Sequence, residues 1–291
     1  MLAIKKYSAP RTLETAARIL AAGRATPLAG GTDLLLRWSR GLVDAGPTIV
    51  DLKQIASLRG VSRAKGEIRV RACALLSEIA SDPTVRTVAP VLVEAADRVA
   101  CPQIRNRATI GGNLCNASPA ADTAVPLILL DAVVDLVSAG PGRLTQREVA
   151  ITDFFHGPGA TVVAPGEVLK QVRFKPLPDA VFTAWDKFGT RRAMEIAVAS
   201  VGVAIQVEDG RVVHARVGYG SVAPIPLRGR KAEAELVDHP LSPDVIEKCA
   251  AAARSEVTPI TDVRASAAYR RELVGVMLRR MLERAAHERQ S

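Results

Sequence analysis

Two glycine pairs constrain this chain of 291 residues more than any other feature. The first pair lies in Ala29-Gly30-Gly31-Thr32-Asp33-Leu34, where a strand expected at 26–29 turns into a helix expected from 32 to about 39. The second lies in Thr109-Ile110-Gly111-Gly112-Asn113. Glycine accepts positive φ and lets the backbone approach a ligand closely, so that successive N–H groups can converge on one anion. The two pairs therefore predict a site for a ligand with a diphosphate, with Thr32 and Asn113 adding side-chain hydrogen bonds.

The glycine pairs do not match the common nucleotide-binding fingerprints. The G-x-G-x-x-A match at Gly218-Tyr219-Gly220-Ser221-Val222-Ala223 is followed at once by Pro224, so no helix can open there toward a phosphate. A single glycine pair is often no more than a tight turn. Two pairs flanked by threonine, aspartate and asparagine favour a ligand, and the helix after the first pair would add partial positive charge.

The first fifty or so residues predict a small parallel sheet, because strands and helices alternate there. A helix capped by Thr12 ends near Gly23, and a buried strand is expected at 48–52. The pattern changes in the next block, where Ile68, Val70 and Ala72 alternate with Arg69 and Arg71. The expected elements are a half-buried strand at 67–73, a helix at 83–100, a long loop at 101–121, a short helix at 123–130 and strands at 133–137 and 168–174.

Pro176 and Pro178 predict a boundary, beyond which the chain is α+β. Two apolar runs at 194–207 and 211–219 are joined by Glu208-Asp209-Gly210, which is a hairpin signal. Helices are expected at 242–256 and from about 265 to 287, where apolar residues recur at helical spacing.

The formal net charge of +9 raises the question of nucleic acid. The basic residues are scattered among acids, and five Phe, three Tyr and two Trp provide few platforms for stacked bases. We therefore expect no nucleic-acid partner. A solvated surface is the simplest interpretation, and a docking face for a partner or an anionic cofactor are the alternatives.

The remaining composition predicts a cytoplasmic chain without a membrane span. No stretch of 18 residues lacks Asp, Glu, Lys and Arg, and the first residues hold no apolar stretch long enough for a signal peptide. The four cysteines show no C-x-x-C spacing and the four histidines are isolated, so we expect neither a metal site nor an iron–sulfur cluster on this chain. We also expect no catalytic side chain.

The second glycine pair lies in a longer run that is informative as a whole. Arg105-Asn106-Arg107-Ala108-Thr109-Ile110-Gly111-Gly112-Asn113-Leu114-Cys115-Asn116-Ala117-Ser118-Pro119-Ala120-Ala121-Asp122 closely resembles the FAD-binding medium subunit of molybdenum hydroxylases, the family of xanthine, carbon monoxide, nicotine and aldehyde dehydrogenases. The first pair is similar to that family's first FAD loop. Further matches, in the family's order, are Asp153-Phe154-Phe155, Gly166-Glu167-Val168-Leu169, Met194-Glu195-Ile196-Ala197 and the run from Asp262 to Arg271.

The resemblance implies an α+β fold of two domains. An FAD-binding domain of the vanillyl-alcohol-oxidase (PCMH) type is expected over 1–175, with subdomains at about 1–57 and 58–175. A C-terminal domain of antiparallel strands and helices is expected over 176–291.

The resemblance also implies which residues bind FAD. The backbone of both glycine loops is expected to hold the diphosphate, Asp122 the nucleotide part, and Leu169 and Lys187 to line the flavin. A lysine there would stabilise negative charge on reduced flavin, although Lys187 could equally be a solvated lysine at a strand edge. The full set is Ala29, Gly30, Gly31, Thr32, Asp33, Leu34, Thr109, Ile110, Gly111, Gly112, Asn113, Asp122, Leu169 and Lys187.

The function implied is that of an electron-transfer subunit. FAD on this chain would collect electrons from [2Fe–2S] clusters of a small partner subunit and pass them to a terminal acceptor, while a large subunit with molybdopterin hydroxylates the substrate. A dimer of such heterotrimers is expected. Two alternatives are a self-sufficient FAD-dependent oxidoreductase with its own small-molecule substrate, and a nucleotide-responsive binding module without flavin.

Overall fold

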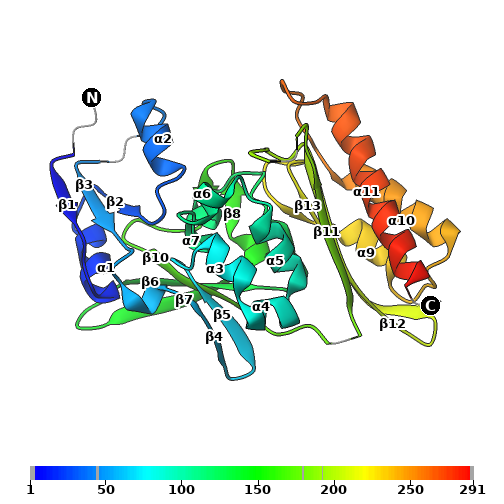
Figure 1. Cartoon of the computed structure of the whole chain (residues 1–291), viewed down its shortest axis with the longest axis horizontal. Coiled ribbons are helices and arrows are strands. Elements are labelled where there is room, and N and C mark those ends of the chain that lie inside the picture. Colours follow the sequence, from blue (N-terminus) through cyan, green and yellow to red (C-terminus); the bar gives the residue numbers. More distant parts are fainter. Residues whose placement is uncertain (1–3, 44–45, 179, 192, 289–291) are drawn as a thin grey trace.

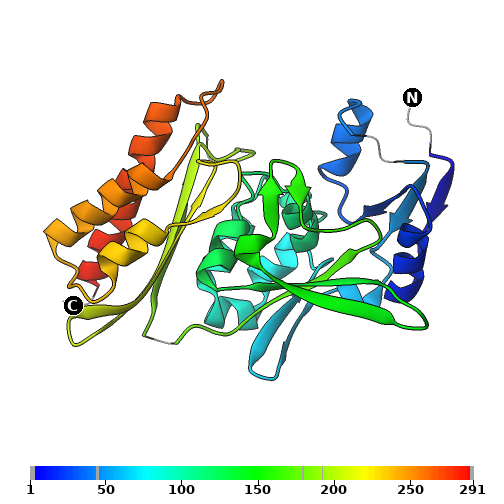
Figure 2. The same ribbon diagram turned by 180° about the vertical axis from the view of Figure 1, so that it is seen from behind.

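The computed structural model describes residues 4–43, 46–178, 180–191 and 193–288. The expectation about the amino terminus rests partly on residues 1–3, which lie outside this range. Three main sheets follow one another along the longest axis of the molecule, from the amino-terminal to the carboxy-terminal end (Figure 1). The same order is visible from behind (Figure 2). No helix in the described part of the chain is both long and apolar enough to cross a membrane.

The first sheet is parallel, as the alternation of strands and helices predicts. Its strand order is β1–β3–β2, and the side chain of Thr12 caps the first helix by accepting a hydrogen bond from the N–H of Thr15. The second helix begins at Leu34, two residues later than predicted, with Asp33 at its N-cap position. The elements are β1 (Lys6–Ser8), α1 (Leu13–Ala21), β2 (Ala25–Leu28), α2 (Leu34–Ser39) and β3 (Thr48–Asp51).

The middle sheet is antiparallel, with the strand order β4–β5–β10–β6–β7. Helices pack beside it, and a two-stranded hairpin, β8–β9, lies in the chain between its strands β7 and β10. The strands are β4 (Val61–Ala64), β5 (Glu67–Arg71), β6 (Val133–Ala139), β7 (Leu144–Ala150), β8 (Phe155–Gly157), β9 (Ala160–Thr161) and β10 (Val168–Phe174). The helices are α3 (Leu76–Ser81), α4 (Pro83–Val88), α5 (Pro90–Asp97), α6 (Pro102–Arg105), α7 (Ile110–Cys115) and α8 (Ala124–Leu129), with 3-10 turns at Ala56–Leu58 and Ile151–Asp153.

Two expectations for this block are wrong. The helix expected at 83–100 is divided into α4 and α5, because Pro90 has no N–H to continue the first helix and disfavours helical backbone at Ala89. The loop expected at 101–121 contains α6 and α7, which are too short to produce a helical apolar pattern. Gly111 and Gly112 thus lie in the first turn of a helix that is capped by Thr109.

The third sheet has the order β11–β12–β13–β14 and is antiparallel. The predicted hairpin is confirmed: Glu208 pairs with Arg211, and both turn residues have positive φ, 47° at Asp209 and 77° at Gly210. α9, α10 and α11 cover one face of this sheet (Figure 1). The elements are β11 (Phe182–Phe188), β12 (Ala199–Glu208), β13 (Arg211–Gly220), β14 (Leu227–Arg228), α9 (Arg230–Leu236), α10 (Pro243–Glu256) and α11 (Ala267–His287).

The opposite face of this sheet receives α8 from the middle block. Two glycines allow the close approach: a Cβ at Gly202 would lie 2.9 Å from side-chain carbons of Val125 and Leu129, and one at Gly218 would lie 3.1 Å from Val125. Trp185 of β11 completes the apolar contact. Because α8 begins just after residue 122, this packing helps to fix the position of a predicted site residue.

Candidate functional site

A cavity of about 640 Å³ is lined by both glycine loops and by residues of the middle sheet. Its lining includes every residue that the sequence predicts for the site except Ile110 and Lys187. Ile110 is fully buried in the core, and its N–H donates to the carbonyl of Ala74 at 3.2 Å. Lys187 lies on the edge strand β11, behind the cavity wall.

The two glycine loops touch each other through their backbones. A Cβ at Gly30 would lie 2.1 Å from the carbonyl oxygen of Arg107, just before the second loop. A Cβ at Gly111 would lie 2.7 Å from the carbonyl oxygen of Ala72, and Gly31 has φ of 78°. Glycine alone satisfies these contacts and this dihedral, so Gly30 is required for the two loops to meet and Gly111 for the second loop to pack against Ala72.

Backbone donors of the first loop are free to bind a ligand. Within the described residues, the N–H groups of Gly30, Gly31 and Thr32 have no hydrogen-bond acceptor, and all three residues line the cavity. In the second loop, the Thr109 hydroxyl accepts a hydrogen bond from the N–H of Gly112 at 3.1 Å. The Asn113 side-chain oxygen accepts one from the Thr123 hydroxyl at 2.6 Å. The first loop therefore supplies the donors that an anion would need.

Asp122 combines a paired oxygen with an unpaired one. Its Oδ2 lies 2.5 Å from the ammonium nitrogen of Lys187, which also donates to the carbonyl of Arg98 at 2.7 Å. Its Oδ1 is buried and has no partner among the described residues. Burial raises the pKa of Asp122, and the Lys187 ammonium opposes that shift. Lys187 thus contacts Asp122, and Asp122 lines the cavity.

Several other lining residues have chemistry that the sequence reasoning did not assign to the site. Arg37 of α2 donates to the side-chain oxygen of Asn116 at 3.0 Å, across the space between the two loops. Burial raises the pKa of the nearby Asp33 carboxyl, and the Arg37 charge opposes this. No local pattern in the sequence reveals the contact between Arg37 and Asn116, because the two residues are 79 positions apart in the chain.

Two cysteines also line the cavity, Cys73 and Cys115. Burial raises the pKa of the Cys73 thiol to about 12. Cys115 is exposed to the cavity, and desolvation by the surrounding protein raises the pKa of its thiol to about 12 as well. Both thiols therefore stay protonated near neutral pH.

Two carboxylates of the lining are held by neighbouring groups. Glu167 accepts two hydrogen bonds of 2.7 Å from the guanidinium of Arg147, and its pKa is lowered by this contact. Glu195 accepts hydrogen bonds from the N–H of Arg191 and the hydroxyl of Thr190. Backbone N–H donors lower its pKa.

These features fit FAD. Free backbone donors suit a diphosphate, the unpaired Oδ1 of Asp122 suits a hydroxyl or N–H donor, and the apolar residues of the lining suit flat rings. The volume also lies in the range of small-molecule and cofactor sites. A bulkier residue at Gly30 would fill the space in which the first loop meets Arg107, and one at Gly111 would clash with Ala72.

Comparison with known proteins agrees with this fit. The family model described as the FAD-binding domain in molybdopterin dehydrogenase matches residues 2–177. The model described as the CO dehydrogenase flavoprotein C-terminal domain matches residues 186–285.

Individual relatives are similar over almost the whole chain. The xanthine dehydrogenase FAD-binding subunit of Escherichia coli O157:H7 is 32% identical over 288 residues, covering 98% of this chain and 97% of the relative. The glyceraldehyde dehydrogenase medium chain of Sulfolobus acidocaldarius is 30% identical over 281 residues, covering 96% and 98%.

A solved structure has the same fold. Reconstituted CO dehydrogenase from Oligotropha carboxidovorans contains a chain that superposes with a TM-score of 0.91 and 30% identity, covering 97% of each chain. The predicted fold class, a PCMH-type FAD-binding unit with a C-terminal α+β domain, is thereby confirmed, as is FAD as the cofactor. The chain therefore belongs to the family of FAD-binding medium subunits of molybdenum hydroxylases.

Proposed function

We propose that this chain is an electron-transfer subunit. It takes electrons from [2Fe–2S] clusters of a small partner subunit and passes them to a terminal acceptor, while a large molybdopterin subunit hydroxylates the substrate. When bound, FAD supplies the chemistry that connects one-electron and two-electron transfer. The residues of this chain bind and orient it. We further propose a dimer of such heterotrimers as the assembly.

One observation carries this proposal: two thiols of the cavity have a raised pKa, and two of its carboxylates are engaged by neighbouring donors. The thiols of Cys73 and Cys115 are protonated near neutral pH, because each has a pKa of about 12. Glu167 is engaged by Arg147 and Glu195 by Thr190 and Arg191. These groups support a binding site better than a catalytic site for covalent or acid–base chemistry at a small substrate.

The border of the cavity favours approach by another protein. Leu36, Met194 and Ile196 line the cavity, and each is about half exposed, at 50%, 51% and 52%. Exposed apolar residues that gather around a functional site are typical of protein–protein interfaces. A partner that covers them would come close to the cofactor, as electron transfer requires.

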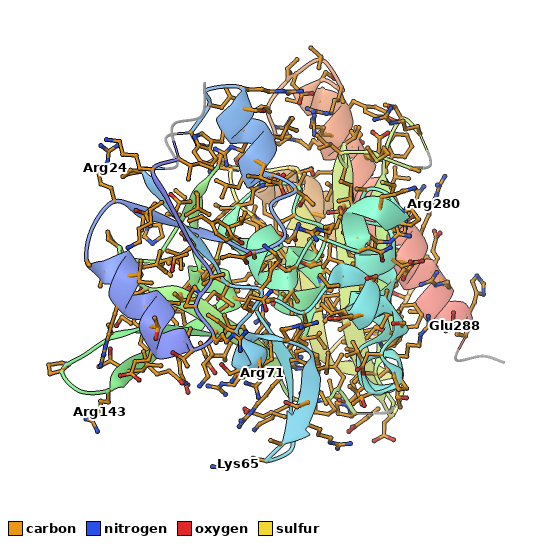
Figure 3. The ribbon with its side chains drawn as sticks, turned by 60° about the vertical axis from the view of Figure 1, so that its left-hand side comes forward. Arg24, Lys65, Arg71, Arg143, Arg280 and Glu288 are labelled. Atoms are coloured by element: carbon orange, nitrogen blue, oxygen red, sulfur yellow. The ribbon has the colours of Figure 1, made fainter. Side chains whose placement is uncertain are left out.

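The basic surplus supports the same proposal less specifically. Arg24, Lys65, Arg143 and Arg280 lie at widely separated points of the molecule (Figure 3). Such scattered charge fits general solubility and electrostatic complementarity to acidic partners. All four cysteines are free, which favours the reducing cytoplasm as the location.

The first experiment is affinity purification of the tagged full-length chain from its native host. We expect a yellow complex with one larger and one smaller subunit, the latter with the absorption of [2Fe–2S] clusters. Purified chain that is colourless and takes up no added FAD would contradict the flavin assignment.

The second experiment separates a transfer subunit from a self-sufficient oxidoreductase. Xanthine, glyceraldehyde and carbon monoxide are useful substrates to test, because relatives of similar identity are named for each. Under anaerobic conditions, bleaching of the flavin absorbance by one of them is expected in the complex and not in the isolated FAD-loaded chain. Bleaching of the isolated chain by such a substrate would favour the self-sufficient enzyme.

A further inference from the structure

The charged side chains of the cavity lining are mostly acidic, although the ligand that the cavity fits is an anion. Asp33, Asp122, Glu167 and Glu195 contribute carboxyl groups. Arg37 is the single basic side chain among the described residues of the lining. The diphosphate of FAD carries negative charge at neutral pH, so this cation is in a position of electrostatic importance.

The charge of Arg37 is only partly offset by the protein, through the nearby Asp33 carboxyl, where it opposes the burial that raises the pKa of that group. Asp122, Glu167 and Glu195 each have a basic partner outside the lining, namely Lys187, Arg147 and Arg191. Arg37 forms no ion pair with the described residues, and its recorded partner is the uncharged amide of Asn116. A guanidinium has five N–H donors, so most of its donors stay free for a ligand.

The position of this side chain relates it to both glycine loops. Arg37 lies on α2, which follows Gly30-Gly31, and Asn116 follows α7, which contains Gly111-Gly112. The hydrogen bond of 3.0 Å between their side chains therefore connects the elements that continue from the two loops. The Arg37 side chain therefore lines the cavity where it contacts the residue that follows α7.

We propose that Arg37 binds the diphosphate of FAD and is a determinant of FAD affinity in this chain. Its guanidinium adds a positive charge to the uncharged backbone donors of the first loop. This deepens the proposed function and depends on it only in requiring that the chain binds FAD. In the alternative, Arg37 serves only to connect the two subdomains through Asn116.

Calorimetric titration of FAD into the FAD-free full-length chain tests the proposal. For Arg37→Gln we expect the dissociation constant to rise about tenfold to hundredfold at low ionic strength, which is typical for loss of a charge-assisted hydrogen bond. The difference from the wild type should shrink as salt is added, because ions screen the attraction. Arg37→Lys should lie between the two, since it retains the charge and loses the planar fork.

Arg40→Gln is the matched control, because it removes a positive charge from an exposed position at the end of the same helix, outside the cavity lining. It should bind FAD within about twofold of the wild type. Thermal unfolding without FAD shows whether each variant is folded.

FAD affinity of Arg37→Gln equal to that of the wild type would overturn the proposal. Equal losses of FAD affinity in Arg37→Gln and Arg37→Lys that do not change with salt would also overturn it, because they would show that Arg37 only connects the two subdomains. Failure of the proposed function looks different: the wild type would then not bind FAD, or its FAD would not be reduced within the complex.

Discussion

The ammonium nitrogen of Lys187 lies 2.5 Å from Oδ2 of Asp122, and this contact connects the C-terminal sheet to the wall of the cofactor cavity. Both side chains are less than a tenth exposed. A second ion pair, Arg98 with Asp186 at 2.5 Å, lies next to it and joins the same two parts of the chain. The C-terminal sheet thus supports a cavity residue in addition to any role in docking partners.

Removal of this lysine should destabilise the chain strongly. Lys187→Met leaves the Asp122 carboxylate buried without its cation, and such a loss costs about 3–5 kcal/mol. We expect the free energy of unfolding, measured by urea denaturation of the FAD-free chain, to fall by this order. FAD affinity should fall as well, because Asp122 is then free to move or to become protonated.

A double variant distinguishes the buried pair from simple loss of packing. In Lys187→Met with Asp122→Asn, no charge is left uncompensated, so most of the lost stability should return. Lys65→Met is the matched control, because Lys65 projects at the outer end of the β4–β5 hairpin (Figure 3). Lys187→Met with the stability of the wild type would show that the ion pair is not needed.

The close backbone contact of the first glycine loop predicts the effect of adding a side chain at Gly30. Gly30→Ala places a Cβ within 2.1 Å of the backbone oxygen of Arg107, which has no flexible end that could move aside. The two loops must then separate, and we expect FAD binding to be lost together with about 2 kcal/mol or more of stability. Equilibrium dialysis with FAD and thermal unfolding measure the two effects.

Gly23→Ala is the control for this exchange, because a Cβ at Gly23 meets nothing within 4 Å. It should leave FAD affinity unchanged. FAD binding by Gly30→Ala with wild-type affinity would mean that the loops do not need their close contact.

The parts of this fold that could be predicted from sequence are those determined by residues close together in the chain. The parallel pattern of the first fifty or so residues, the strand at Val168–Phe174 and the hairpin at Asp209-Gly210 follow from apolar spacing and turn chemistry, and all three are present. β7 was not predicted, since most of its residues are exposed and show no alternation of buried apolar residues. β11 was likewise not predicted.

The candidate site likewise contains features that are visible in a short stretch of sequence and features that depend on contacts between distant residues. The glycine loops carry their signal within a few residues, and they line one cavity. The roles of Lys187 and Arg37 depend on contacts with Asp122 and Asn116, which are 65 and 79 residues away in the chain. No spacing rule reveals such contacts. The role of Lys187 at the flavin stays a prediction from the resemblance, and the structure adds its contact with Asp122 of the cavity lining.

The raised pKa of the Cys115 thiol predicts slow alkylation in spite of its access to the cavity. With a pKa of about 12, only a small fraction is thiolate at pH 8, so iodoacetamide should react much more slowly than with an ordinary cysteine. The rate should rise steadily with pH above 8. Mass spectrometry of peptides from the FAD-free chain measures this rate.

Bound FAD should protect Cys115, because the residue lines the cavity that we assign to the cofactor. Cys101 lies outside this lining and is partly exposed, so its labelling serves as the reference. Equal labelling of Cys115 with and without saturating FAD would place the cofactor elsewhere.

Asp262 gives a prediction about pH. Its carboxylate accepts hydrogen bonds from the N–H groups of Arg264 and Ala265, and from the buried guanidinium of Arg270 at 2.7 Å. The backbone N–H of Arg264 and the other donors hold the pKa of Asp262 below its ordinary value. A carboxyl whose pKa is lower in the folded state stabilises that state above its unfolded pKa, near 3.9, and loses this contribution as pH falls through the folded value.

Asp262→Asn should therefore reduce the free energy of unfolding at pH 7 by about 1–3 kcal/mol, because it leaves the Arg270 guanidinium with a weaker, uncharged acceptor. The difference from the wild type should narrow as pH falls below about 4, because the Asp262 carboxyl of the unfolded wild-type chain then becomes protonated while the folded state still holds it charged. Urea denaturation at pH 7 and pH 3 measures both values.

The control Asp97→Asn, at an ion pair whose carboxylate is 66% exposed, should change stability by less than about 1 kcal/mol. A difference for Asp262→Asn that stays constant between the two pH values would show that the effect comes from altered shape or hydrogen bonding and not from the carboxylate charge.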